Sequence, residues 1–398
     1  MQYISRASFF ALSVSLSTGS FAQAEAISIR QCVAQEADRE GLSGSILVSQ
    51  RDQTIANVAR GRLADETSPP IDASTRFNLG SASKMFTAVA IGQLIEEGKL
   101  RFDQPVGDVV SGLTPEASRV TIRQLLNHTS GLGDFFRPQN MGAMLRARSA
   151  SDILPLIASD KPAFPPGSKF SYSNSGFALL GIVIERVSGL TYGAYLRRHV
   201  FRTAGMDHTG LDPRPLSTLA VGMTAGWMPN ASAGRQLVLI GSDGKSLRRA
   251  ADRSSSPPKL RPAPGATEGY GSPAGGLFST VEDMRKFGVA LMQGKLMRPT
   301  TVHEFTSPQV EAAPAASDKP AKYYGFGFGI SSEGGLRWYG HNGGTLGANA
   351  EFAIQPDHQW VISVLSNRDP PTATHIMAWI KALLADPSRR KSCSTRSK

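Results

Sequence analysis

Cysteine, metal-binding patterns and long apolar runs are all scarce in this sequence, and each scarcity narrows what the protein can do. The 398 residues include two cysteines, Cys32 and Cys393, and neither lies in a motif, so cysteine catalysis is not expected. The sequence has no H-E-x-x-H pattern and no paired cysteine ligands, so neither a metal site nor an organic cofactor is expected. No segment reaches the roughly 20 apolar residues of a membrane-spanning helix.

Acidic residues are outnumbered by basic ones, which gives a formal net charge of +11. The basic residues are scattered along the chain except for a cluster in the tail around Arg389, Arg390 and Lys391. No nucleic-acid-binding motif surrounds them, so a solvated basic surface is expected and a nucleic-acid partner is not. An exported protein of this charge could also bind anionic polymers of the cell envelope.

The first 24 residues have the pattern of a signal peptide. Arg6 supplies the positive start, residues 9–16 form a short apolar core, and Ala22-Gln23-Ala24 fits the small-x-small cleavage pattern. The alternative is a buried first helix. We expect a cleaved signal at 1–24, a mature catalytic domain at 25–398 and export, most simply to a bacterial periplasm.

The two cysteines lie near opposite ends of the mature chain. Disulfides persist outside the cytoplasm, and the termini of a domain are often close together. A Cys32–Cys393 disulfide is therefore one hypothesis, and two free thiols are the other, because sequence alone does not fix the geometry.

Strand patterns at both ends of the chain enclose a mostly helical middle. Residues 45–48 and 54–58 flank a polar turn and indicate a hairpin, and further strands are expected at 324–330, 336–339, 348–354 and 360–365. The expected fold is α/β (α+β), with one antiparallel sheet built from residues 25–80 and 285–390 and flanked by helices. A helical region at 81–284 includes an irregular, Pro-rich insertion at 212–270.

Ser81-Ala82-Ser83-Lys84 matches the pattern S-x-x-K at the start of an expected helix. Ser81 and Lys84 are one helical turn apart and share a face. A serine hydroxyl needs a nearby base to act as a nucleophile, and a partly desolvated lysine can lose its proton and provide one. Taken alone, the pattern also fits an ordinary helix start with a solvated lysine.

Two further motifs carry groups that could act with this pair. Tyr172-Ser173-Asn174 supplies a phenol that can act as a general base or acid, and an amide that can hold the lysine and the substrate. Gly340-His341-Asn342-Gly343-Gly344 supplies a histidine that can be charged near neutral pH, and glycines that free a backbone N–H for an oxyanion. Alone, each could be a polar loop or a strand end.

In this order, the three motifs resemble the serine β-lactamase and penicillin-binding-protein superfamily, in particular its class C-like branch of β-lactamase-related serine hydrolases. Similar stretches occur at 77–80, 97–106, 121–132 and 274–280, so the resemblance covers most of the mature chain. It implies an α/β sandwich with an inserted helical region.

The resemblance also implies roles for single residues. Ser81 is expected to be the acylated nucleophile, Lys84 to tune it and relay its proton, and Tyr172 to be the general base. Asn174 is expected to position the substrate, and the backbone N–H groups of Ser81 and Gly344 to form the oxyanion hole. His128, in a similar stretch, is expected to be structural.

His341 departs from the superfamily pattern, in which many members carry lysine there within K-T-G. A partly charged histidine suits recognition of a substrate carboxylate less well than lysine does. Together with Gly343 and Gly344, His341 is still expected to line the substrate site. We therefore expect a serine hydrolase acting on a small ester, an amide or a D-amino-acid peptide of the cell wall, such as an esterase or DD-carboxypeptidase. The alternatives are a β-lactamase proper and a penicillin-recognising scaffold protein that does not turn over.

Overall fold

The computed structural model describes residues 28–224, 227–230, 234–240, 246–249, 260–263, 266–267, 271–315, 320–389 and 393. The expected signal peptide at 1–24 lies outside the described residues, as does most of the basic tail.

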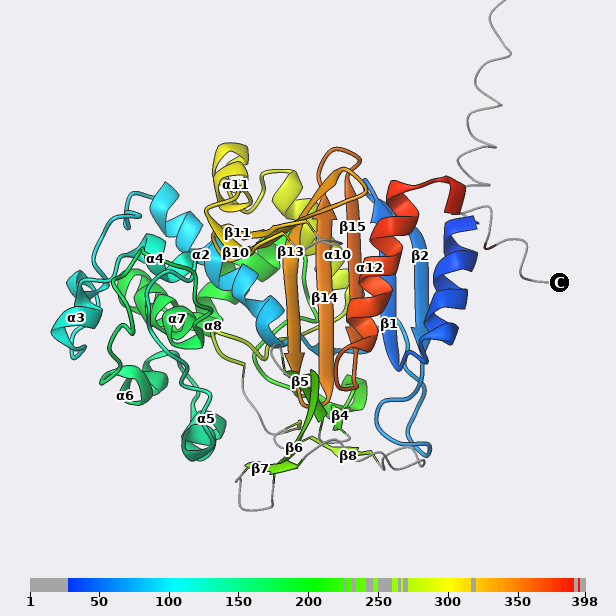
Figure 1. Cartoon of the computed structure of the whole chain (residues 1–398), viewed down its shortest axis with the longest axis horizontal. Coiled ribbons are helices and arrows are strands. Elements are labelled where there is room, and N and C mark those ends of the chain that lie inside the picture. Colours follow the sequence, from blue (N-terminus) through cyan, green and yellow to red (C-terminus); the bar gives the residue numbers. More distant parts are fainter. Residues whose placement is uncertain are drawn as a thin grey trace, which may run out of the picture.

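An eight-stranded antiparallel sheet forms the centre of the molecule, in the order β10-β11-β12-β13-β14-β15-β1-β2 (Figure 1). Strands β1 and β2 come from the N-terminal part of the chain, and β1 pairs with β15 from the C-terminal part. This is the expected sheet built from both ends. Its strands are β1 (Gly44–Gln50), β2 (Gln53–Arg60), β10 (Val310–Ala313), β11 (Lys322–Tyr324), β12 (Gly329–Glu333), β13 (Leu336–Thr345), β14 (Ala348–Gln355) and β15 (Trp360–Ser366).

Helices cover both faces of this sheet (Figure 1). One face packs against the helix of residues 28–39 and against α12 (Thr372–Ala385), whose Ile376, Met377 and Ile380 face the sheet at helical spacing. The other face packs against α10 (Val281–Met292), where the rings of Phe287 and Phe352 are 5.8 Å apart. Burial on both faces explains why β14 and β15 are buried along their whole lengths.

The helical region lies at one end of the sheet and is centred on two apolar helices, α2 and α7, which pack against each other. Two short strands, β3 (Phe77–Asn78) and β9 (Phe278–Ser279), pair with each other and join this region to the sheet. Its helices are η1 (Gly80–Ser83), α2 (Lys84–Glu96), α3 (Pro115–Ser118), α4 (Ile122–Leu126), α5 (Met141–Arg146), α6 (Leu154–Ile157), α7 (Asn174–Ser188), α8 (Tyr192–Tyr195) and α9 (Arg202–Ala204). Single turns η2 (Val106–Asp108), η3 (Pro138–Asn140), η4 (Ser151–Ile153) and η6 (Leu216–Thr218), the π-helical η5 (Leu196–Phe201), and α11 (Pro299–Phe305) near the sheet complete the set.

Two segments differ from the sequence-based expectation. The run 324–330 is two strands rather than one, because the chain turns at Gly325 and Gly327, and Gly327 has a φ of +78°. The insertion expected to be irregular contains β4 (Met223–Thr224), β5 (Trp227–Asn230), β6 (Gly234–Ile240), β7 (Ser246–Arg249) and β8 (Arg261–Pro262), and β5, β6 and β7 form a small sheet. The sequence Leu-Val-Leu-Ile ending β6 is rich in strand-forming residues, but the Pro-rich flanks masked this signal.

Among the described residues, no single helix is both long and apolar enough to cross a membrane. Helix α7 and the helical stretch 192–204 pass that test together on length and composition, with a bend of 73° between them. The central residues of α7 are buried in the core of the molecule, and buried core helices meet the same criterion.

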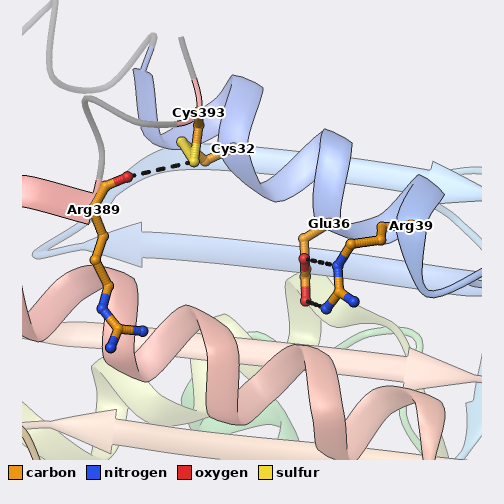
Figure 2. Close-up of a disulfide and its surroundings, with 5 residues drawn as sticks. All are labelled: Cys32, Glu36, Arg39, Arg389 and Cys393. Atoms are coloured by element: carbon orange, nitrogen blue, oxygen red, sulfur yellow. Dashed lines mark hydrogen bonds and ion pairs between the residues drawn. A yellow bond between two sulfur atoms is a disulfide. The ribbon is translucent and has the colours of Figure 1, made fainter. Parts of the chain in front are cut away.

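A disulfide joins Cys32 to Cys393, as one of the two hypotheses from the sequence predicted (Figure 2). Cys32 lies on the helix of residues 28–39, and Cys393 follows α12, with 5.3 Å between the two Cα atoms. Beside it, Cys393 Sγ lies 3.6 Å from the carbonyl oxygen of Arg389. The bond therefore ties the C-terminal end of the chain to the helix that covers the sheet.

Replacing both cysteines with serine should lower the free energy of unfolding by about 2–5 kcal/mol, because the unfolded chain loses a long closed loop. Urea denaturation with and without reductant checks this, and reductant should destabilise only the wild-type protein. Two free thiols in denatured, unreduced wild-type protein would contradict the pairing.

Candidate active site

Ser81 lies in the tight turn η1, immediately before α2. Gly80 has a positive φ of +49°, and its N–H donates to Asn78 Oδ1 at 2.8 Å, which fixes the approach to the turn. The Ser83 hydroxyl donates to the carbonyl oxygen of Gly80 and accepts from the Leu277 N–H. The backbone that carries Ser81 is thus held from several sides, which is what a precisely oriented nucleophile requires.

Lys84 is completely buried and its ammonium nitrogen lies 3.2 Å from Ser81 Oγ. The same nitrogen donates to Asn174 Oδ1 at 2.7 Å and to the carbonyl oxygen of Ala274. Desolvation lowers the pKa of Lys84 to about 7, although the negative charge of Asp134 opposes this change. A large fraction of Lys84 is therefore neutral near pH 7, as a proton acceptor for Ser81 needs to be.

Tyr172 and Asn174 lie at the start of α7, on the other side of Lys84. Ser173 caps this helix, since its hydroxyl accepts from the Gly176 N–H. The Lys84 ammonium lies 4.8 Å from the centroid of the Tyr172 ring. The residue as a whole is 39% exposed. Desolvation raises the pKa of the Tyr172 phenol, and its interaction with Ser81 only partly offsets this change. This direction disfavours the phenolate that a Tyr172 general base would need in the resting enzyme.

His128 packs against the start of α7. It is fully buried, its Nδ1 accepts the Ser173 N–H at 3.1 Å, and its ring centroid lies 4.3 Å from that of Tyr172. Burial and the positive charge of Lys84 hold the pKa of His128 well below its usual value. His128 is thus neutral and packs against Tyr172, so the structural role expected from the sequence remains a prediction.

Replacing His128 with asparagine should lower kcat at least tenfold with a small change in KM, because Tyr172 would lose its packing partner. Asparagine tolerates the φ of 60° at this position. The free energy of unfolding should also fall, by about 1–3 kcal/mol, if the Ser173 N–H loses its acceptor. Steady-state kinetics and denaturation check this, with the exposed His375→Asn as control. Lost stability with unchanged kcat would limit His128 to a folding role.

The glycines of β13 bring a second backbone N–H towards Ser81. A Cβ atom on Gly343 would lie 2.9 Å from the Ser81 nitrogen, and one on Gly80 would lie 3.0 Å from the Gly344 nitrogen. The backbones of η1 and β13 are therefore in direct contact, and only residues without side chains fit between them. This contact places the N–H groups of Ser81 and Gly344 on neighbouring segments, as a two-donor oxyanion hole requires.

His341 is buried and engaged on both ring nitrogens. Its Nδ1–H donates to the carbonyl oxygen of Asn342 at 2.6 Å, so its Nε2 accepts from the Tyr324 hydroxyl at 2.8 Å. Desolvation and the charge of Lys84 lower the pKa of His341 to about 3. The partial charge expected from the sequence is therefore absent at neutral pH, and His341 cannot act as a cationic anchor for a substrate carboxylate.

Asp134 belongs to this site, although the motifs did not point to it. Its Oδ2 accepts from Asn174 Nδ2 at 2.7 Å, which directs Asn174 Oδ1 towards Lys84. Asp134 follows the stretch 121–132 by two residues and is a charged residue among glycine and aromatic neighbours. The contrast between Asp134 and these neighbours was the signal in the sequence that could have pointed to it. The hydrogen bond to Asn174 could not be predicted, because it depends on how α7 packs.

The sequence is similar to those of known proteins. The family model described as Beta-lactamase matches residues 29–386. Penicillin-binding protein 4* of Bacillus subtilis is 30% identical over 188 residues, but the match covers 45% of this chain and 40% of that protein. The chain thus spans well under half of that relative's length.

Two solved structures have similar folds. The penicillin binding protein from Bacillus halodurans has a TM-score of 0.70 and 30% identity, and the match covers 88% of this chain and 98% of that one. D-amino acid amidase from Ochrobactrum anthropi, complexed with L-phenylalanine, has a TM-score of 0.71 at 21% identity, over 92% and 99% of the two chains. The Beta-lactamase family model matches nearly the whole described region, and this match shows that the chain belongs to the Beta-lactamase family.

Proposed function

We propose that this protein is an exported serine hydrolase that cleaves small esters or amides through an acyl-enzyme on Ser81. The observation that carries the proposal is the buried Lys84, whose ammonium nitrogen lies 3.2 Å from Ser81 Oγ and whose pKa is lowered to about 7. Family membership supports the serine hydrolase class. The disulfide and the signal-peptide pattern support export.

In the first half of the reaction, Ser81 Oγ attacks the carbonyl carbon of the substrate and its proton passes to neutral Lys84. The oxygen of the tetrahedral intermediate gains negative charge, which the N–H groups of Ser81 and Gly344 stabilise. Tyr172, which is protonated in the resting enzyme and packs against Lys84, donates its proton to the leaving alcohol or amine and recovers one from Lys84. The C–O or C–N bond breaks, leaving the acyl group on Ser81.

In the second half, water attacks the acyl carbon and Lys84, neutral again, accepts a proton from that water through Tyr172. The bond from Ser81 Oγ to the acyl carbon breaks, Ser81 recovers its proton, and the acid leaves. Lys84 and Tyr172 thus act as one relay, with Lys84 as the proton store and Tyr172 as the donor. No metal or organic cofactor takes part in these steps.

His341 disfavours the β-lactamase alternative. Penicillins carry a carboxylate, and a neutral, fully engaged histidine offers it no charge. The same argument weighs against a peptidase that binds a free C-terminal carboxylate at this position. Esters and amides without that group are therefore the better substrates.

Intact-mass spectrometry of the mature protein tests the proposal. We expect a fluorophosphonate to add once, on the Ser81 peptide, and p-nitrophenyl esters to be turned over, with slow release of any penicillin adduct. Fast penicillin turnover would instead identify a β-lactamase. A lasting penicillin adduct without ester turnover would identify a non-hydrolytic scaffold, and no adduct with any probe would refute Ser81 as the nucleophile.

A further inference from the structure

A cavity of about 500 Å³ opens directly onto Ser81. It is lined by Ser81 and Asn174 on one side and by Gly344 on another, so a bound acyl group would reach the nucleophile and the N–H of the oxyanion hole together. Cavities of this size hold molecules well beyond a two-carbon acyl group. The room beside Ser81 is therefore larger than a minimal substrate needs.

The walls of this cavity are mainly apolar. One wall comes from the segment between α4 and α7 and includes Phe135, Phe136, Met144 and Ile153. A second wall includes Leu211, Ala220, Pro273 and Phe278. Apolar side chains from both walls would remove an apolar acyl group from water.

Two carboxylates, the half-buried Glu185 and the buried Asp283, hold both walls in place. On the first wall, Glu185 of α7 accepts from the N–H groups of Ala150, Ser151 and Tyr192 at 2.8–3.0 Å. These contacts fix the backbone beside Ile153 and the start of α8. Hydrogen bonds from three separate backbone positions to one carboxylate make this wall rigid.

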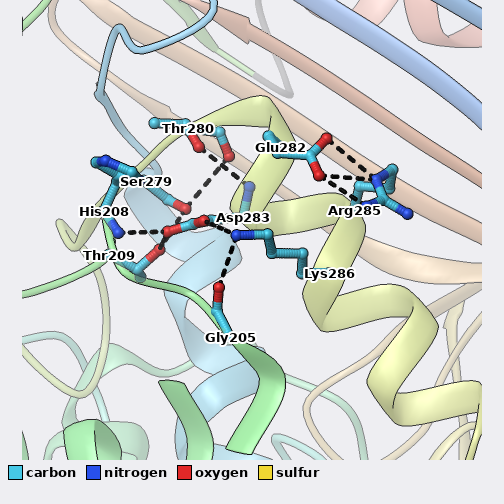
Figure 3. A network of polar contacts seen from close by, with 9 residues as sticks. All are labelled: Gly205, His208, Thr209, Ser279, Thr280, Glu282, Asp283, Arg285 and Lys286. Atoms are coloured by element: carbon cyan, nitrogen blue, oxygen red, sulfur yellow. Dashed lines mark hydrogen bonds and ion pairs between the residues drawn. The ribbon is translucent and has the colours of Figure 1, made fainter. Parts of the chain in front are cut away.

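On the second wall, Asp283 of α10 accepts from the His208 N–H at 2.7 Å and from the Thr209 hydroxyl at 2.8 Å (Figure 3). The segment then continues to Gly210, which exchanges two backbone hydrogen bonds with Phe278. Leu211 and Phe278 are thereby held against the cavity. Hydrogen bonds within the protein thus hold both walls, so little energy would be lost in ordering them when a ligand binds.

The described residues that line this cavity include few charged side chains. Among the described residues that line it, Arg148 is the charged one; it is exposed, and its Nη1 donates to the carbonyl oxygens of Leu145 and Ala147. An acyl chain extending from Ser81 towards Ile153 and Phe278 therefore meets apolar surface. A charged acyl group would lose its hydration there, and Arg148 is the one described lining residue with a charge that could compensate.

We propose that this cavity is the acyl-binding pocket and selects a bulky, uncharged, apolar acyl group. This inference rests on the proposed serine hydrolase function and names its substrate class: esters and amides of aromatic or medium-length aliphatic acids. Each methylene that enters the pocket should raise kcat/KM about fourfold, until the cavity is filled.

A series of p-nitrophenyl esters tests this, from acetate through butyrate and hexanoate to octanoate, with phenylacetate as the aromatic member. We expect kcat/KM to rise at least tenfold from acetate to hexanoate. p-Nitrophenyl hemiglutarate is the matched anionic probe and should react at least tenfold more slowly than the hexanoate. A flat or falling series, or equal rates for the anionic and neutral esters, would overturn the inference.

A filling variant links the preference to this cavity. Ala147→Trp should lower kcat/KM for hexanoate and phenylacetate at least fivefold more than for acetate, whereas the exposed Ala315→Trp, which is remote from the lining, should leave the series unchanged. An unaltered ratio in a folded Ala147→Trp protein would contradict the assignment.

Fluorophosphonate labelling of Ser81 distinguishes a failure of the acyl pocket from a failure of the proposed hydrolase function. A labelled enzyme that hydrolyses acetate without preferring larger groups would refute the acyl pocket and leave the hydrolase intact. An enzyme with neither labelling nor hydrolysis would refute both.

Discussion

Replacing Ser81 with alanine should abolish ester turnover and covalent labelling, with a fall in kcat on the order of 10⁴-fold or more. The reason is that the acyl-enzyme requires an oxygen at this position, and the turn that holds Ser81 offers no substitute at the same distance from Lys84. The variant should stay folded, because the side chain removed is small and its hydrogen-bond partner Lys84 keeps Asn174 and Ala274. Ester-hydrolysis assays measure the loss of turnover, and peptide mapping of fluorophosphonate-treated protein measures the loss of labelling.

The matched control is Ser83→Ala, two residues further along the same motif. Its hydroxyl is occupied by Gly80 and Leu277 within the buried turn, so it cannot attack a substrate. This control should lose some stability yet still carry one adduct on the Ser81 peptide. An adduct that persists in Ser81→Ala, or one that disappears only in Ser83→Ala, would assign the nucleophile to another residue.

Local patterns in the sequence predicted the parts of the site that depend on spacing along one element. Ser81 and Lys84 share one helical turn, and the glycines around His341 end a strand, so their nearness to each other follows from the fold class. The charge state of His341 could not be predicted in this way. It depends on burial by the assembled fold and on the positive charge of Lys84, which belongs to another element.

The role of Asp134 was hidden for a similar reason. It acts on Lys84 through Asn174, and this link exists only once α7 has packed against α2. The antiparallel sheet was predictable, because both ends of the chain carry strong strand patterns. The small sheet of β5, β6 and β7 was not, because proline-rich neighbours obscured a short strand signal.

Replacing Lys84 with alanine should lower kcat on the order of 10³-fold or more, since it removes the base that activates Ser81. Tyr172→Phe should have a comparable effect, and the double variant should be little worse than either single one, because the members of one relay are not additive. Additive losses would mean that Lys84 and Tyr172 act in separate steps. Near-normal rates in either single variant would remove that residue from the mechanism.

The pH dependence of the wild-type enzyme should report the same lysine. Because neutral Lys84 is the active form and its pKa is lowered to about 7, kcat/KM should rise as pH increases through about 7. The negative charge of Asp134 favours the ammonium and so raises this pKa. In Asp134→Asn, the rising limb should therefore move to lower pH, by about half a pH unit or more.

The matched control for this shift is Asp103→Asn, which removes a solvent-exposed carboxylate that pairs only loosely with Arg101. It should leave the profile where it is, which separates a local charge effect from a change in net charge. A limb that moves to higher pH in Asp134→Asn would show that the ionising group is not a lysine favoured by that carboxylate. A limb that stays in place in Asp134→Asn but vanishes in Lys84→Ala would keep Lys84 as the base, and would restrict Asp134 to holding Asn174.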